Sequence, residues 1–576
     1  MKNTKLKLLA VVMSGALFIV IAGCNGLGKM VKNAGTITYE VTPKPLELHG
    51  DSVAVTIKGK YPPKYFNKKA AITVTPVLTY AGGEKAFKSV SYKGEASKAE
   101  GTVINYASGG SFSYTDKVAY TNDMKVSELK IKAAASVKTK SKEFPGIKIA
   151  DGVITTPLLV MQDDKPILGA DKFTKTVPRT SNADIHFVVN QSNIRPAELK
   201  MDDVQALNGF IKTGAQKGYA FMNVEISAYA SPDGEERMNA GLAERRAEET
   251  AKYLAGEFKR LKLDSIAKTE GFFKKTSTPE DWEGFKRLME KSDIKDKDLI
   301  LRVLGMYSDL EQREKEIKNL AATYTVVAEN ILPQLRRSQI RINAEERSRT
   351  DEQLTNLVNT TPDSLSLEEI LYAATLTNDL ESKLKIYQSA ARIYPEDWRG
   401  FNNTGYVYLL QNKLNDAQAQ FEKANSISAG NPVVTNNLGV VAHLKGDRNK
   451  AAELFREASS ESNANYNLGI IEIQNGNYES AVSKMAGVNS FNAALAKTLA
   501  KNNEGALTTL EASPDKDSAM GYYLKAIIAA RSNNNSLMVN SLKSAINKDA
   551  SLKAKAKDDL EFMKYRSNSD FTALVN

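Results

Sequence analysis

Residues 34–160 alternate short apolar and polar runs with the period of a β-strand. In the runs 53–57 and 71–77, successive side chains switch between hydrophobic and polar types, which places them on opposite faces of a sheet. Glycine pairs at 82–83 and 109–110 separate such runs and are typical of turns. Several short strands joined by turns predict an all-β, sandwich-like domain over 34–160.

From residue 182 the period changes, and strands alternate with longer amphipathic helices. The apolar positions Val204, Leu207 and Ile211 form one helical stripe. A mostly helical insertion is expected at about 276–329. The other predicted elements are strands at 185–189, 221–230 and 269–273, helices at 202–215 and 237–261, and a strand that ends the stretch 331–342. This order predicts a central α+β domain over 182–345.

Residues 365–576 have a helical pattern that repeats. Tyr387, Phe421 and Phe455 recur at intervals of 34 residues, and Gly405 and Gly439 share that interval. Small residues let paired helices touch, while an aromatic ring fills the gap beside them. The pattern resembles the tetratricopeptide repeat, which implies a C-terminal α-solenoid over 365–576.

Two polar stretches separate these regions. Residues 161–181 contain Pro166 and Pro178 and are predicted to be a linker with little chemistry. Residues 346–364 begin with a run of charged residues and are predicted to be a second linker. The overall expectation is a multidomain chain in which three folded regions are joined by linkers.

The first residues have the composition of a secretory leader. Lysines near the start precede an apolar run at 8–22, and Cys24, the single cysteine of the chain, follows. Residues 21–24 resemble the bacterial lipobox, which implies removal of 1–23 and a lipid on Cys24 at the head of a tether over 24–33. The alternative is a plain membrane anchor with an accidental cysteine. By the same resemblance, the absence of aspartate after Cys24 implies the outer membrane, with the periplasmic face favoured and the cell surface as the alternative.

Charge and chemistry exclude several functions. The formal charge is +10, or +7 without the three leader lysines, and no basic block with interleaved aromatics appears, so nucleic-acid binding is not expected. His49, His186 and His443 lie in different segments without paired ligands, which predicts no metal site. No catalytic or nucleotide-binding motif is present, so we expect neither an enzyme nor a cofactor beyond the lipid.

The central domain carries a polar loop between a strand and a helix at 227–247. Its order of elements resembles the OmpA-like domain, which binds peptidoglycan. The resemblance implies candidate ligand residues in two loops and one helix: Asn190, Ser231, Asp233, Asn239 and Arg246.

One departure weakens the peptidoglycan prediction. Where the family has an aspartate, this chain has Ser231, so the ammonium of a diaminopimelate ligand would lack its partner charge, while Arg246 could still hold a carboxylate. For Arg246 the alternative is a helix-surface arginine paired with Glu249 or Glu225. For Asn239 it is a cap or turn asparagine.

Asn403, Asn437 and Asn467 each precede a repeat glycine by two residues. At that position of a tetratricopeptide repeat, side chains line the concave groove, and three amides in a row can bond the backbone of an extended peptide. Packing between helices is the alternative role.

Together these features predict a lipid-anchored, non-catalytic scaffold of the cell envelope, with protein partners in the groove and peptidoglycan as a possible second ligand. A genuine peptidoglycan anchor and a surface-exposed adhesion or assembly lipoprotein are the alternatives.

Overall fold

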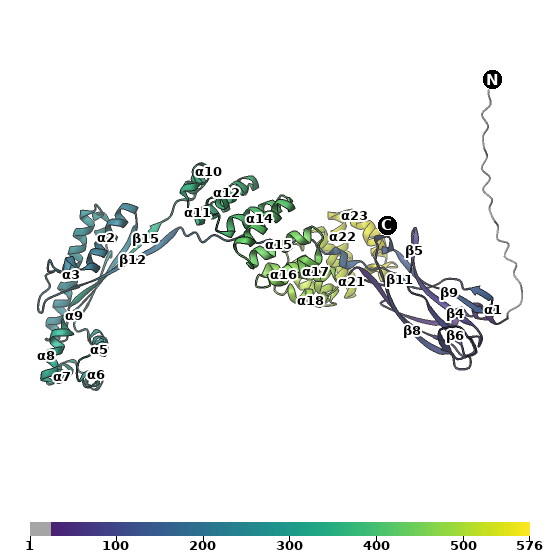
Figure 1. The fold of residues 1–576 in the computed structure, drawn as a ribbon, viewed down its shortest axis with the longest axis horizontal. Coiled ribbons are helices and arrows are strands. Elements are labelled where there is room, and N and C mark those ends of the chain that lie inside the picture. Colours follow the sequence, from purple (N-terminus) through teal and green to yellow (C-terminus); the bar gives the residue numbers. More distant parts are fainter. Residues whose placement is uncertain (1–24) are drawn as a thin grey trace, which may run out of the picture. The chain divides into compact units, whose positions relative to one another are not determined.

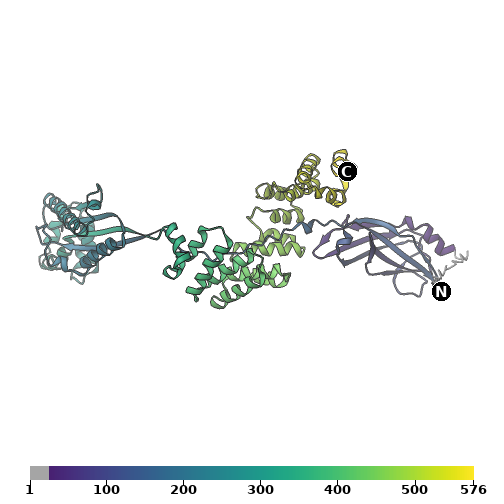
Figure 2. The same cartoon turned by 90° about the horizontal axis from the view of Figure 1, so that it is seen from above.

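The computed structural model describes residues 25–576 (Figures 1 and 2). The predicted leader and the predicted lipidation site Cys24 lie outside the described residues. The chain divides into two compact units. The first combines the described part of Met1–Gly169 with Tyr394–Asn576, and the second is Ala170–Ile393.

The first unit begins with two β-sheets. The smaller sheet is antiparallel and consists of β1 (Thr38–Thr42), β2 (Leu48–His49), β3 (Ser52–Tyr61) and β8 (Gly110–Ala119), with β3 paired to the other three. The larger sheet has the order β10-β9-β4-β6-β7, with β11 also on β9 and β5 also on β4. Its strands are β4 (Ala71–Tyr80), β5 (Gly83–Ala86), β6 (Val90–Gly94), β7 (Thr102–Ile104), β9 (Ser127–Val137), β10 (Lys140–Glu143) and β11 (Ile147–Gly152).

One core joins the two sheets. Alternate residues of β3, among them Val53 and Ile57, are buried in the same cluster as Leu78 of β4 and Leu129 of β9. This is the period-two burial that the sequence predicts, because every second side chain of a strand points to the core. The predicted β-rich N-terminal region is confirmed.

Within the predicted tether 24–33, the described residues begin with a helix, α1 (Asn25–Lys32), that packs on this domain. Leu27 and Met30 are three residues apart, so they share one helix face, and both are buried in the β core. The hydroxyl of Tyr65 donates to the carbonyl oxygen of Met30 at 3.0 Å.

The rest of the first unit is a helical repeat array, drawn from green to yellow in Figure 1. The predicted C-terminal helical repeat region is confirmed. The helices are α13 (Trp398–Leu410), α14 (Leu414–Ile427), α15 (Pro432–Leu444), α16 (Arg448–Glu457), α17 (Ser462–Gln474), α18 (Tyr478–Lys484), α19 (Phe491–Leu499), α20 (Asn503–Glu511), α21 (Ala519–Arg531), α22 (Asn535–Lys548), α23 (Ser551–Asp558) and α24 (Ser569–Val575), with a 3₁₀ turn at Leu560–Tyr565.

The repeat glycines mark the points where paired helices touch. A Cβ on Gly405 would lie 2.8 Å from the Phe421 ring, and one on Gly439 would lie 2.6 Å from the Phe455 ring. Real Cβ atoms do not approach carbon that closely, so a small residue and an aromatic ring are required together. This explains why both recur with the same interval in the sequence.

The β domain packs against the array within the first unit. The Tyr478 hydroxyl donates to the carbonyl oxygen of Leu48 at 3.3 Å, and the His49 ring meets the Tyr478 ring edge-on at 5.1 Å. At the C-terminal end, the Thr156 hydroxyl donates to the Glu561 carboxylate. Hydrogen bonds therefore join the N-terminal domain to α18 and to the 3₁₀ turn at Leu560–Tyr565.

The second unit contains a four-stranded mixed sheet in the order β12-β15-β13-β14, in which only β13 and β14 are parallel. Helices α2 and α3 pack on it, and their residues Leu207, Ile211 and Phe258 share a core with Val224 and Ile340 of the sheet. The elements are β12 (Thr176–His186), α2 (Asp202–Lys217), β13 (Ala220–Tyr229), α3 (Glu236–Arg260), α4 (Asp264–Ala267), β14 (Phe273–Thr278) and β15 (Arg337–Arg347).

A helical insertion lies between β14 and β15 and has its own core, which includes Phe285, Met289 and Ile300. Its helices are α5 (Trp282–Lys291), α6 (Lys297–Met306), α7 (Leu310–Lys318), α8 (Ala321–Asn330) and α9 (Leu332–Leu335). The unit ends in α10 (Asp351–Thr360), α11 (Leu367–Ala373) and α12 (Leu380–Ile393).

Several predicted boundaries are corrected. Strand β12 begins at Thr176, inside the predicted linker 161–181, because it pairs with the long strand β15 along its whole length. Strand β14 begins only at Phe273 rather than ending there. The predicted linker 346–364 contains α10, which starts with a capping box between Thr350 and Gln353 and buries Leu354.

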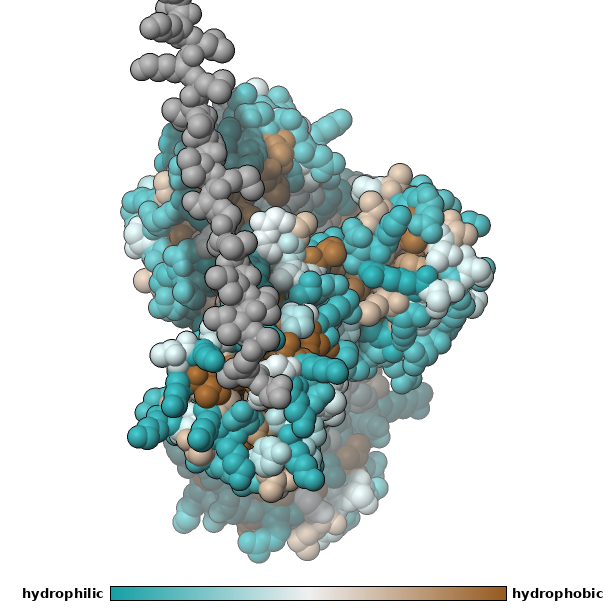
Figure 3. Space-filling model, turned by 90° about the vertical axis from the view of Figure 1, so that its right-hand side faces the viewer, coloured by the Kyte–Doolittle hydropathy of each residue, from teal (hydrophilic) through white to brown (hydrophobic). Residues whose placement is uncertain are grey.

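No helix among residues 25–576 combines the length and the apolar composition needed to span a bilayer. On the side drawn in Figure 3, hydrophilic residues dominate, and the hydrophobic ones form small separated groups.

Candidate functional site

Four helices of the array each place one asparagine on a common line. We call Asn403, Asn437, Asn467 and Asn492 the asparagine ladder; they belong to α13, α15, α17 and α19, the first helices of successive pairs. All four are buried. A buried amide requires hydrogen-bond partners for both its oxygen and its nitrogen, so the ladder must face other polar groups.

The partners are backbone groups of the chain itself. Residues 161–169, which the sequence predicted to be part of a linker, pass along the ladder, and each asparagine bonds the N–H and the C=O of one residue. The N–H and C=O distances are 2.7 and 2.9 Å for Gly169 on Asn403, 2.7 and 2.7 Å for Ile167 on Asn437, 2.7 and 3.2 Å for Lys165 on Asn467, and 2.8 and 2.8 Å for Met161 on Asn492.

The spacing shows that the segment is extended. Residues 165, 167 and 169 present their backbone groups to the same side, as alternate residues of a strand do. The segment also runs against the order of the repeats, because its first residue meets Asn492 and its last meets Asn403. The asparagine side chains thus replace the neighbouring strand of a sheet.

A second pair of asparagines orients the ladder. Asn402 and Asn436 stand one residue before ladder members, and their amides donate to the carbonyl oxygens of Ile167 and Lys165 at 3.1 and 3.0 Å. The oxygen of Asn402 also accepts from Asn437 at 2.9 Å. The amide of Asn437 is therefore held in one orientation by its neighbour.

Sequence reasoning missed Asn402, Asn436 and Asn492. The signal for the first two is the Asn-Asn pair, which occurs twice at the repeat interval. Asn492 has no following glycine and lies only 25 residues after Asn467, so the interval could not reveal it.

The segment also buries a charge in the array. The carboxylate of Asp164 accepts from Nδ1 of His443 at 2.8 Å, and both side chains are 2% exposed. Nε2 of His443 lies 3.1 Å from the oxygen of Gln474. Because both ring nitrogens face oxygen atoms, the arrangement favours the doubly protonated, charged imidazole.

The pKa of His443 reflects this environment. Burial by itself lowers the pKa, but the hydrogen bond and the negative charge of Asp164 oppose it and raise the pKa above its ordinary value. Arg448 acts in the opposite direction as a smaller influence. His443, whose position in the sequence suggested no metal site, therefore helps to bind the segment through Asp164.

Two further contacts restrict which side chains the segment can carry in the groove. The Tyr466 hydroxyl donates to the Asp163 carboxylate at 2.8 Å. At the other end, a Cβ added to Gly169 would lie 2.8 Å from Cγ of Arg399 and 3.1 Å from the Trp398 ring. The groove thus accepts aspartate near the start of the segment and requires glycine at its end.

The predicted ligand residues of the second unit lie in a different environment. Arg336, just before β15, donates to the Ser231 hydroxyl through Nε at 3.1 Å and to the Asp233 carboxylate through a terminal nitrogen at 3.0 Å. The Ser231 hydroxyl donates to the same Asp233 carboxylate. Asp233 thus supplies a negative charge beside the neutral Ser231. Arg336 of the same chain neutralises that charge.

Arg246 is fully buried. Its guanidinium donates to the carbonyl oxygens of Gln191, Tyr229 and Val188 at 3.0, 2.9 and 3.3 Å, and it lies 5.2 Å from the Phe187 ring centre. Burial and the neighbouring Arg336 lower the pKa of Arg246 to about 10. It is neither a surface arginine paired with Glu249 or Glu225 nor, in this structure, open to a ligand carboxylate.

The other two predicted ligand residues, Asn239 and Asn190, lie in different surroundings. Asn239 is buried and donates to the carbonyl oxygens of Ser231 and Gly234 at 3.3 and 3.0 Å, so it holds the turn together. Asn190 is exposed, with a φ of 54°, in the loop after β12. The structure therefore gathers Ser231, Asp233 and Asn239 and leaves Asn190 outside.

The helical insertion lies beside this loop. Burial raises the pKa of Tyr324 in α8, and the negative charge of Asp233 adds to the effect. Asp233 also influences Lys318 of α7. The side chains of Asp233 and Arg336 are 17% and 11% exposed, so little of the charge pair remains open to solvent.

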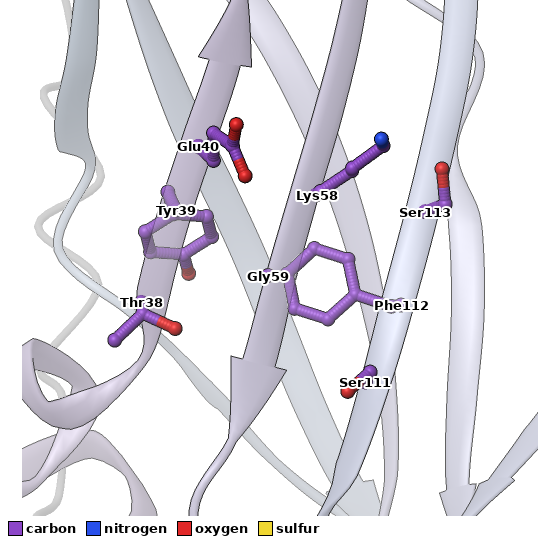
Figure 4. A pocket seen from close by; sticks show the side chains of 8 residues that line it. All are labelled: Thr38, Tyr39, Glu40, Lys58, Gly59, Ser111, Phe112 and Ser113. Atoms are coloured by element: carbon purple, nitrogen blue, oxygen red, sulfur yellow. The ribbon is translucent and has the colours of Figure 1, made fainter.

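A shallow depression on the outer part of β1, β3 and β8 offers no comparable chemistry (Figure 4). Phe112 lies over Gly59 there, where a Cβ would come within 2.3 Å of the ring. Among residues 25–576, no group of three or more His, Cys, Asp or Glu side chains is placed to hold a metal ion.

Comparisons with known proteins give partial matches. No protein-family model matches the chain. It is similar to the BBSome complex member BBS4 of Bos taurus, with 27% identity over 120 residues, which are 20% of this chain and 23% of that protein. The match thus spans about a quarter of that relative's length.

Several solved structures also match part of the chain. Pseudomonas aeruginosa PilF is 15% identical over 38% of this chain and 100% of its own, with a TM-score of 0.29. YrrB, described as a TPR protein with an unusual peptide-binding site, is 19% identical over 36% of this chain and 99% of its own, with a TM-score of 0.22. The tetratricopeptide-type array of this chain is defined by its own helix pairs and glycine interval.

Proposed function

We propose that this protein is a lipid-anchored, non-catalytic scaffold of the cell envelope whose repeat array binds an extended segment of a protein partner. The observation that carries the proposal is the asparagine ladder. Its amides satisfy both backbone groups of alternate residues, a way of holding an extended peptide that does not depend on side chains. In the structure, residues 161–169 of the chain itself occupy that position.

The partner is tested by crosslinking in cells and co-purification in detergent. Wild-type protein is expected to retain a discrete partner that the Asn437→Leu variant loses, because leucine cannot bond the backbone of the partner. Asn415→Leu is the matched control, since Asn415 is exposed on the second helix of a pair. Equal recovery of the partner with both variants would contradict a role for the groove.

The anchor is proposed from the lipobox resemblance at Cys24. Metabolic labelling with a fatty acid is expected to mark the wild type and not Cys24→Ser, and the variant is expected to leave the membrane fraction. Protease treatment of intact cells tests the side of the membrane. Degradation of the mature protein there would favour the surface-exposed alternative over the periplasmic one.

Peptidoglycan binding is the second candidate, and the order of strands and helices in the second unit supports an OmpA-like domain. The charge pair of Asp233 with Arg336, with side chains 17% and 11% exposed, is the group that a polar ligand would meet at the loop. Because Arg246 is turned toward backbone carbonyls, we expect purified muropeptides not to bind the wild type. Tight binding that Asp233→Asn abolishes would instead establish a cell-wall anchor.

A further inference from the structure

Residues 162–169 are held mainly by polar contacts, whereas the residues just before them are held by apolar ones. Leu159 and the neighbouring Val160 and Met161 pack on the hydrophobic core of the array. From Gln162 onward, the segment contacts the array through hydrogen bonds and through the ion pair of Asp164 with His443, and both side chains of that pair are 2% exposed. Water can take over these hydrogen bonds when residues 162–169 leave, and neither hydrophobic cluster of the array includes any of those residues.

The same contacts are selective. Asp164 reaches a buried imidazole, which a neutral side chain could not match in charge. Five residues later, the chain passes so close to Trp398 and Arg399 that only glycine fits. A backbone ladder alone would accept any extended chain, so these two positions add a sequence requirement.

We propose that residues 161–169 are a tethered competitor in a sequence-selective peptide site. The partner is an extended protein segment with an aspartate for His443 and, five residues further on, a glycine for the space beside Trp398. This rests on the proposed peptide-binding function and names the partner's chemistry and its regulation. A tethered segment competes at an effective concentration on the order of millimolar, so a partner must exceed that or act when the segment is released.

The test uses a synthetic peptide with the sequence of residues 160–171 and a fluorescent label. The full chain is prepared as wild type and as a variant in which 161–169 is replaced by nine glycine and serine residues. We expect the peptide to bind the variant and to bind the wild type at least about tenfold more weakly, because the wild-type groove is filled. Circular dichroism establishes that the variant is folded.

Altered peptides test the selectivity. Asp164→Asn and Gly169→Leu in the peptide are each expected to weaken binding to the variant by about tenfold or more, through loss of a charged partner or through steric overlap. Gln162→Ala is the matched control, since Gln162 is exposed and should leave binding unchanged. Equal binding of all four peptides would overturn the sequence requirement.

A second protein variant provides the test if the variant with the glycine and serine replacement does not fold. The double substitution Asp164→Asn with Gly169→Leu in the full chain weakens the tethered segment and leaves the array untouched, so the wild-type peptide should bind it better than it binds the wild-type protein. If neither folded variant binds the peptide, the segment is a fixed connection and the proposal is wrong. A partner captured through Asn437 in cells would then still support the proposed function.

Discussion

At the scale of residues, the asparagine ladder shows how the same side chain serves different ends. Asn437 bonds the backbone of a segment 270 positions away in the sequence, whereas Asn239 bonds its own turn. Both are buried amides with satisfied partners, which is the general requirement for such groups. The difference comes from what faces each amide, not from the residue type.

Loss of one ladder amide should be costly. Asn437→Ala leaves the N–H and C=O of Ile167 without their side-chain partner, which is expected to destabilise the first unit by about 1–3 kcal/mol. Chemical denaturation followed by circular dichroism measures the change. Asn415→Ala, on an exposed helix face, is the control and should change stability by less than about 0.5 kcal/mol. Equal effects would show that Ile167 does not depend on the amide.

The contact between His443 and Asp164 should depend on pH. Because the pKa of folded His443 is raised, its stabilisation is complete below the unfolded value of about 6.5 and is lost as the pH rises through the folded pKa. His443→Gln should therefore lower the free energy of unfolding by about 1.5–3 kcal/mol at pH 6 and by less at pH 9. Denaturation of both proteins at the two pH values measures this; a difference that grows with pH would contradict it.

At the scale of elements, the repeat glycines fix how closely paired helices approach. A Cβ on Gly439 would lie 2.6 Å from an atom of the Phe455 ring, whereas a Cβ on Gly256 in α3 would have no atom within 4 Å. The two glycines are both helical and look alike in the sequence. Only the neighbouring helix distinguishes a required glycine from a replaceable one.

Opposite effects are therefore expected from the same substitution. Gly439→Ala should destabilise the first unit by about 1–3 kcal/mol through overpacking. Gly256→Ala should stabilise the second unit by about 0.5–1 kcal/mol, because alanine is the better helix former. Thermal unfolding of the two variants checks the signs, and a stabilising Gly439→Ala would mean that the α15–α16 pair can open without cost.

At the scale of the whole molecule, the two units have separate cores. Phe455 is buried in the array of the first unit, and Phe258 is buried beneath the sheet of the second. Two cores that share no residues can unfold in separate steps. The second unit is inserted in the sequence of the first, because the chain returns to the first unit at Tyr394–Asn576.

Calorimetry of the full chain is expected to show two transitions. Phe455→Ala should lower the midpoint of one and Phe258→Ala that of the other, since deleting a buried phenylalanine costs about 3–5 kcal/mol. Each single variant serves as the control for the other. A single transition that both variants shift together would mean that the units unfold as one.

The sequence by itself determined the features that repeat over short distances. Alternation of period two marked the strands of the N-terminal domain, and the interval between Phe421 and Phe455 marked the helix pairs. Strand ends were less well predicted: β12 starts earlier than its hydrophobic pattern, because pairing with β15 rather than its own composition extends it. The local pattern of polar and apolar residues reveals that a strand is present. Its ends depend on the neighbouring strand with which it pairs.

Only the tertiary structure decided what the candidate residues contact. Residues 161–169 have the proline and charge of a linker, yet 234 positions separate Gly169 from the amide of Asn403 that binds it. Arg246 has the spacing of a ligand residue, yet carbonyl groups from the loop after β12 and from the end of β13 satisfy its guanidinium. Burial and partners come from segments far apart in the chain, and no local pattern of polar and apolar residues encodes them.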